Sequence, residues 1–210
     1  MRYALLVLLA LITPAFGQTN VLMNYRDSTG NVTQATANTP FPITGQTNDT
    51  TYSSGDVNIA NTGAGDVLCI AGSATKTVYV KRFRVSGTAT SAIITTASVI
   101  KRSALGSGGT PVTETLVPND SANPASTATV TGYTVSPTSG AAVGTMRTRK
   151  VAVGVQGATA TSSESLFDFA DYYDQPLVLR GVAQNACINT GAAGSGGSWA
   201  VDVEWTEETP

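Results

Sequence analysis

Hydrophobic and polar residues alternate strictly near the end of this chain. Every second position from 199 to 205 carries a large hydrophobic side chain, and small or acidic residues stand between them. Because successive side chains of a strand point to opposite faces, a period of two predicts a β-strand over residues 198–206. Trp199 and Trp205 are expected in a core, with Asp202 and Glu204 facing water.

The same kind of segment recurs along the chain. Residues 77–86 alternate too, with Phe83 and Tyr79 expected on one face and Val78 and Val80 on the other. Each such segment is rich in Val, Thr, Ile or aromatic residues and is bounded by Gly, Pro, Asn, Asp or Ser. Strands are predicted at 57–60, 66–71, 77–86, 93–102, 113–117, 127–135, 145–155, 165–169, 177–183, 186–189 and 198–206.

A sustained helical period is missing from the sequence after its first residues. Many short strands with no helices to cover a parallel sheet favour an all-β fold. The architecture predicted for residues 56–210 is an antiparallel β-sandwich of jelly-roll type.

The first 17 residues have the pattern of a secretory signal peptide. Arg2 precedes an apolar run over 4–12, and Ala15 and Gly17 supply the small residues of a cleavage site. The apolar run is about half the ~20 residues that span a bilayer, so no retained membrane anchor is expected. The alternative is an uncleaved apolar arm. Residues 18–55 are predicted to form an N-terminal arm or hairpin, with strands at 21–26 and 32–36 and a solvated loop at 45–55.

Two cysteines, Cys69 and Cys187, lie in strand-like apolar stretches. An exported protein can join such a pair, and a disulfide here would tie early and late strands together. Two buried thiols that act as small hydrophobes are the equal alternative.

The composition leaves few routes to catalysis. The sequence has no histidine, 12% charged residues and a formal net charge of −2. Neither a serine–histidine pair nor a zinc site can form, no cofactor is expected, and mild acidity argues against nucleic-acid binding. Carboxylates remain: Glu164, Asp168, Asp171 and Asp174 surround aromatic residues, as in a glycosidase, although a short strand and a polar turn explain them better.

Charge is segregated along the chain. Nine of the basic residues fall between positions 76 and 150, among them Arg147, Arg149 and Lys150, and acids dominate on either side. Complementary segments of this kind suit subunit contacts or strand pairing within one molecule. Binding of an acidic glycan or nucleic acid by the basic segment is the alternative. Glu207 and Glu208 are expected in a solvated tail.

Exposed aromatic side chains could stack on sugars. The two tryptophans are assigned to the core, which leaves Tyr52, Tyr172 and Tyr173 as the candidates. Tyr172 and Tyr173 are adjacent, so at most one of them is free if the backbone is extended.

Several stretches together resemble a known group of proteins. They are LCIAGSATKT at 68–77, VIKRS at 99–103, PNDSANPA at 118–125, VEWTEE at 203–208 and DSTGNV at 27–32. On these the chain resembles a group of small tailed-phage and prophage proteins. The resemblance implies a β-sandwich virion or accessory component and carries no catalytic residues.

The functional expectation combines these points. The chain is predicted to be a non-enzymatic structural or interaction protein, secreted or on a virion surface. It would act through self-assembly, as a homo-oligomer or with other virion or surface proteins, or through contact with a host. The alternative is a secreted carbohydrate-binding or adhesin-like module that uses Tyr172, Tyr173 and residues 191–198. A carboxylate-dependent glycosidase comes third.

Overall fold

The computed structural model describes residues 24–26, 32–34, 50–155, 162–170 and 175–209. The chain divides into two compact units, Met1–Thr47 and Asn48–Pro210. The first contains a two-stranded antiparallel sheet of β1 (Asn24–Arg26) and β2 (Val32–Gln34), with Tyr25 opposite Thr33.

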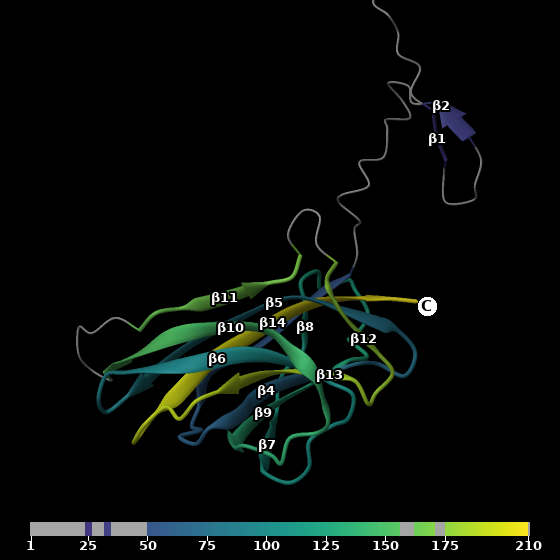
Figure 1. Ribbon diagram of the computed structural model, residues 1–210. Coiled ribbons are helices and arrows are strands. Elements are labelled where there is room, and N and C mark those ends of the chain that lie inside the picture. The colour runs from purple at the N-terminus through teal and green to yellow at the C-terminus, as the bar shows by residue number, and fades with distance from the viewer. Residues whose placement is uncertain (1–23, 27–31, 35–49, 156–161, 171–174, 210) are drawn as a thin grey trace, which may run out of the picture. The chain divides into compact units, whose positions relative to one another are not determined.

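The second unit contains twelve strands and, among its described residues, no helix (Figure 1). The all-β prediction is confirmed. The strands are β3 (Thr51–Ile59), β4 (Gly65–Ala71), β5 (Thr77–Ala89), β6 (Ile93–Arg102), β7 (Thr110–Thr113), β8 (Val117–Pro118), β9 (Thr129–Val135), β10 (Ala142–Val155), β11 (Ser165–Asp168), β12 (Leu177–Arg180), β13 (Asn185–Thr190) and β14 (Ser198–Glu208). The described part of the chain has no helix long and apolar enough to cross a membrane.

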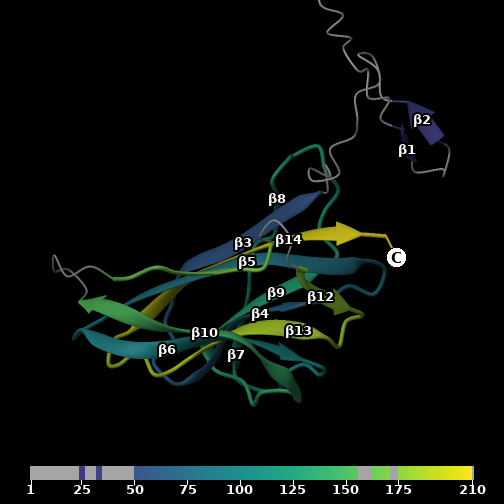
Figure 2. The ribbon, with the colours of Figure 1, turned by 45° about the horizontal axis from the view of Figure 1, so that its top comes forward.

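The strands form two layers that belong to one curled sheet (Figure 2). One layer has the order β8-β3-β14-β5, and the other β7-β9-β4-β13-β6-β10. The layers join where β10 pairs with β5 in parallel, at Gly154 opposite Thr88 and Val155 opposite Ala89. The predicted sandwich of purely antiparallel sheets is therefore corrected to a mixed, continuous sheet, since β10 crosses from one layer to the other.

Strand β5 organises the first layer. One of its edges pairs with β14 along almost its whole length. Its other edge is shared in succession by β12 at residues 77–80, β11 at 82–85 and β10 at 88–89. Because three strands share this edge, each of them pairs with β5 over only a few residues. β10 pairs with β6 over most of its length.

The core lies between the layers, as the alternation of β14 predicts. Trp199, Val203 and Trp205 have no exposed surface, while Asp202 and Glu204 are half-buried on the opposite face. Burying a large side chain of this kind stabilises the fold by ~1.5–3 kcal/mol.

The predicted faces of β5 are wrong before Phe83. Val78 and Val80 are buried on the core side together with Phe83, and Tyr79 is half-buried on the outer side. The reason is a β-bulge, because Glu204 of β14 pairs with Arg82 and the next residue, Trp205, pairs with Val80. The extra residue, Lys81, shifts the alternation by one position.

Two predicted boundaries are also wrong. Residues 51–55, expected in a solvated loop, are the first part of β3, which pairs with β14 from Thr206 opposite Thr51 to Trp199 opposite Ile59. Residues 113–117, expected as one strand, are split between the ends of β7 and β8. Pairing with distant strands decides both cases, and local sequence carries little of that information.

Candidate functional site: a basic strand edge and an acidic hollow

The first half of β10 has a strand partner on one side only. From Ala142 to Val153 it pairs with β6, and among the described residues no other strand pairs with its segment from Ala142 to Lys150 (Figure 1). Every residue of this segment except Gly144 is exposed. A strand that lacks a neighbour presents unpaired backbone N–H and C=O groups along its edge.

This segment carries three basic side chains, those of Arg147, Arg149 and Lys150. We call residues 142–150 the basic edge. The guanidinium groups of Arg147 and Arg149 lie 5.2 Å and 5.9 Å from the ring centres of Phe169 and Phe167, the latter in β11 and the former just after it. Lys150 donates a hydrogen bond from Nζ to Oγ1 of Thr96, at 3.1 Å. All three side chains are exposed, and all three residues lie in β10.

An acidic hollow lies on the outer face of the other layer. It is centred on three residues in neighbouring strands. Asp202 of β14 is paired with Gly55 of β3 on one side and with Arg84 of β5 on the other. Two adjoining depressions of about 280 and 490 Å³ share these three residues. A Cβ atom at Gly55 would lie 2.8 Å from Cβ of Asp202, so the missing side chain keeps the hollow open.

The hollow holds more acids than bases. The charged residues of its lining are Asp56, Arg84, Glu164, Asp202 and Glu204. Burial raises the pKa of Asp202, and Glu164 and Glu204 raise it further, while Arg84 and Arg82 act in the opposite direction. Arg82 is already engaged, because its Nε lies 3.4 Å from a carboxylate oxygen of Glu204. The site therefore favours an additional positive charge.

Charge segregation along the sequence is explained in part by ion pairs within the molecule. Three join the basic middle of the chain to the acidic flanks: Lys76 with Glu207, Arg82 with Glu204, and Arg102 with Asp66. This agrees with the predicted strand pairing. Arg149 and Lys150 take part in no ion pair among the residues that the structure describes.

Glu207 does not lie in a solvated tail, contrary to the prediction. Its carboxylate accepts hydrogen bonds from the hydroxyl groups of Ser126 and Thr127, the backbone N–H of Thr127 and Ala128, and the indole N–H of Trp205. Burial alone would raise the pKa of Glu207, but these hydrogen bonds lower it to about 2. Glu207 is thus a structural anchor for the segment that leads into β9.

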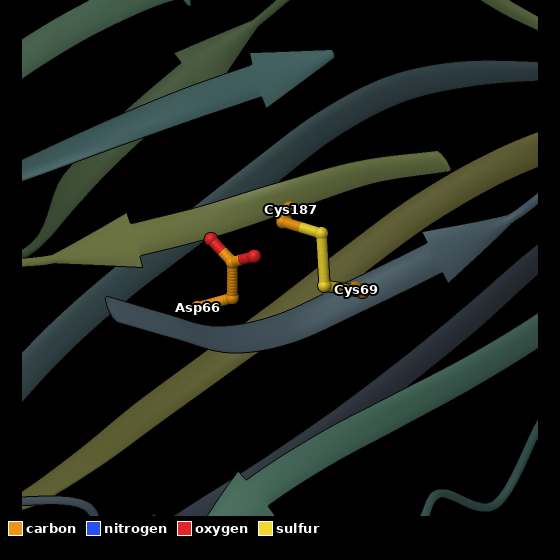
Figure 3. Close-up of side chains that lie close together, drawn as sticks. All are labelled: Asp66, Cys69 and Cys187. Atoms are coloured by element: carbon orange, nitrogen blue, oxygen red, sulfur yellow. A yellow bond between two sulfur atoms is a disulfide. The ribbon is translucent and has the colours of Figure 1, made fainter. Parts of the chain in front are cut away.

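Cys69 and Cys187 form a disulfide across directly opposed positions of β4 and β13. Of the two alternatives that the sequence left open, the structure shows the bond. The neighbours of Cys69, Leu68 and Ile70, belong to the core, so the bridge lies on the other face of the same sheet. Figure 3 shows it beside Asp66.

Asp66 and the two cysteines come within 4.8 Å of one another, which is a spacing that metal ligands can have. Here both sulfur atoms are bonded to each other. The Asp66 carboxylate is occupied as well, since it accepts hydrogen bonds from Arg102 at 2.8 Å, Asn189 at 2.7 Å and Ser139 at 3.0 Å. The cluster therefore fastens the loop at residue 139 to β4, β6 and β13.

Tyr52, one of the three tyrosines predicted to stack on sugars, is not on the surface. Tyr52 is fully buried, stacks on Trp205 with ring centres 5.8 Å apart, and donates its hydroxyl hydrogen to the carbonyl oxygen of Pro124. It faces inward because β3 extends to Thr51. Tyr172 and Tyr173 lie outside the described residues, as do Asp171 and Asp174.

The remaining acids of the glycosidase alternative flank β11. Glu164 is exposed and lines the acidic hollow, whereas Asp168 is half-buried opposite Arg82 and accepts a hydrogen bond from the backbone N–H of Ala170. The sequence grouped Glu164 with Asp168, Asp171 and Asp174, but in the hollow it lies near Asp202. The outward alternation of Asp202 in β14 was a usable signal, whereas nothing in the sequence marked Gly55.

No family model matches this chain, and no curated protein or solved structure matches it either. The resemblance to small tailed-phage proteins stays a prediction.

Proposed function

We propose that this protein is a non-enzymatic structural or interaction protein that works by contact, as a component of a phage-like particle or of another surface assembly. The observation that supports this most is the unpaired edge of β10 from Ala142 to Lys150. Within the described part of the chain, this nine-residue edge pairs with a strand on one side only.

An unpaired strand edge is usually shortened or covered, and contact with another molecule would cover this one. Globular proteins commonly shorten, bend or cover edge strands, because an open edge accepts a strand from another molecule. Here the edge also exposes two apolar side chains, Val143 at 64% and Met146 at 47%. A contact that covers both the backbone edge and these side chains would bury surface that one copy leaves in water.

The test is the mass of the purified protein in solution as a function of concentration. Light scattering after size exclusion is expected to show oligomers that dissociate on dilution. The double variant Val143→Lys, Met146→Lys adds two charges to the edge without touching the core, and it should shift the protein to monomer. Mass spectrometry of the same sample gives its first residue, which tests the predicted cleavage after Gly17.

A matched control is Val182→Lys, since Val182 is 57% exposed in the turn between β12 and β13. This variant should assemble like the original protein. A strict monomer at high concentration would refute self-assembly. Oligomers that tolerate both lysines in β10 would place the contact elsewhere.

A further inference from the structure

We infer that the basic edge of one copy binds the acidic hollow of a second copy, so that copies join head to tail. The inference rests on the proposed function and names the partner surface. Its basis is that each surface carries the charge that the other lacks, and that no ion pair in the described part of the chain joins the two.

Charge on the basic edge argues against the simplest alternative, a two-fold pairing of β10 with β10. Full antiparallel pairing of residues 142–150 with the same residues of a second copy would set Arg149 opposite Val143 and Lys150 opposite Ala142. The cations would then gain no acidic partner across the strands. The partner surface should therefore be acidic, which the net charge of the whole chain allows.

The acidic hollow fits side-chain cations better than a metal ion. Four carboxylates line it, at Asp56, Glu164, Asp202 and Glu204, against the lining guanidinium of Arg84. In the described part of the chain, no three of these carboxylates lie close enough together to hold one metal ion. Carboxylates that are spread over two adjoining depressions suit separate side-chain cations better than a single ion.

Apolar side chains flank both surfaces. Val117, 52% exposed, lines the larger depression, and Leu166, 39% exposed, stands opposite Arg84 at the other side of the hollow. On the basic edge Val143 and Met146 precede the cations. Charged groups with apolar neighbours fix how the two surfaces align, and the apolar side chains add buried area to the contact.

Head-to-tail contact makes a specific prediction about assembly. Each copy has one basic edge and one acidic hollow, so assembly continues into rings or open chains. A copy with a reversed basic edge still offers its hollow, and a copy with a neutralised hollow still offers its edge. Mixed together, two such variants can form one contact and no more.

The experiment uses two double variants of the full chain: Arg149→Glu with Lys150→Glu, which reverses the charge of the edge, and Glu164→Gln with Asp202→Asn, which neutralises two carboxylates of the hollow. Each double variant alone should sediment as a monomer, with self-association weakened at least tenfold, and an equimolar mixture should form a dimer and nothing larger. Circular dichroism and thermal unfolding establish that each variant is folded. Glu164→Gln alone, at an exposed position, serves if the Asp202 variant does not fold.

Matched controls are Arg180→Glu and Glu208→Lys, which reverse charge at exposed positions outside both surfaces and should assemble normally. If the original protein is a monomer, the proposed function fails. If it assembles and the two double variants assemble equally well, the proposed function stands and this inference fails. A mixture that forms larger species than a dimer, or no complex at all, also overturns it.

Salt and pH give an independent readout of the same contact. Added salt should weaken assembly of the original protein, because exposed ion pairs are screened. A bound cation lowers the raised pKa of Asp202, whose other charged neighbours are Arg82, Arg84, Glu164 and Glu204. Assembly should therefore strengthen as the pH rises through the pKa of the free group and weaken below it, and an assembly indifferent to both would contradict the inference.

Discussion

At the scale of single residues, the position of Glu207 shows how hydrogen bonds can outweigh burial. Its side chain has no exposed surface at the ion pair with Lys76, where the nearest atoms lie 3.7 Å apart. A buried carboxylate is costly unless donors surround it, and five donor groups from 126–128 and Trp205 do so here. Its charge therefore stabilises the fold.

Replacement of this carboxylate should make stability less sensitive to acid. In Glu207→Gln the amide NH₂ meets hydroxyl and backbone donors, which should lower the free energy of unfolding at pH 7 by about 2 kcal/mol. The folded-state pKa of about 2 lies below the ordinary value of 4.5. The advantage of Glu207 is thus complete above pH 4.5 and is lost as the pH falls to about 2.

Denaturant unfolding at several pH values between 2 and 7 measures the difference. The gap between the original protein and Glu207→Gln should narrow steadily below pH 4.5. A gap that stays constant over the whole range would show that the carboxylate charge is not what stabilises this segment.

Residue environments were predictable where alternation continues unbroken, and unpredictable where a distant partner decides. The burial of Trp199 and Trp205 follows from the period of two in their own strand. The burial of Tyr52 depends on where β3 begins, and that of Glu207 depends on donors about 80 positions away. No local pattern contains this information.

At the scale of elements, the pairing of β4 with β13 is reinforced by the disulfide. The two cysteines are 118 positions apart, and their strands also exchange a ladder from Asn185 opposite Ala71 to Thr190 opposite Gly65. A cross-link over so long a loop restricts the unfolded chain strongly. The strand character of both cysteine segments was predictable, but their pairing was not, since register depends on the turns and strands between them.

Removal of this bridge should destabilise the protein without changing its fold. The variant Cys69→Ala, Cys187→Ala is expected to lose about 2–5 kcal/mol in the free energy of unfolding, and its far-ultraviolet circular dichroism should stay that of a β protein. The original protein treated with a reductant should approach the variant in thermal stability. Free thiols that react with maleimide in the folded, untreated protein would contradict the bond.

The faces of the strands were less predictable than their positions along the chain. The strand at 93–102 was placed correctly and that at 165–169 to within one residue, because each is bounded by turn-forming residues. The bulge at Lys81 was not foreseen, since it arises from pairing with β14. Local propensity thus located most elements, and tertiary pairing fixed their faces.

At the scale of the whole molecule, the crossing of β10 between layers creates both the continuous sheet and its open edge. Val155 and Gly154 join β5, and the residues from Val153 back to Ala142 follow β6. An all-β class could be derived from composition and period, whereas the crossing could not, because it depends on which distant strands pair with each part of β10. The basic edge and the acidic hollow both follow from this topology and from the bulged ladders around β14.

The central claim, that the protein works through the edge of β10, is tested most directly by amide hydrogen exchange in dilute and concentrated samples. In the dilute sample, the amides of Ala142–Lys150 that point away from β6 should exchange rapidly. In the concentrated sample these same amides, together with those around Gly55 and Asp202, should become protected, while the rest of the molecule is unchanged. Oligomers that form while exchange along 142–150 stays equally fast would contradict the account.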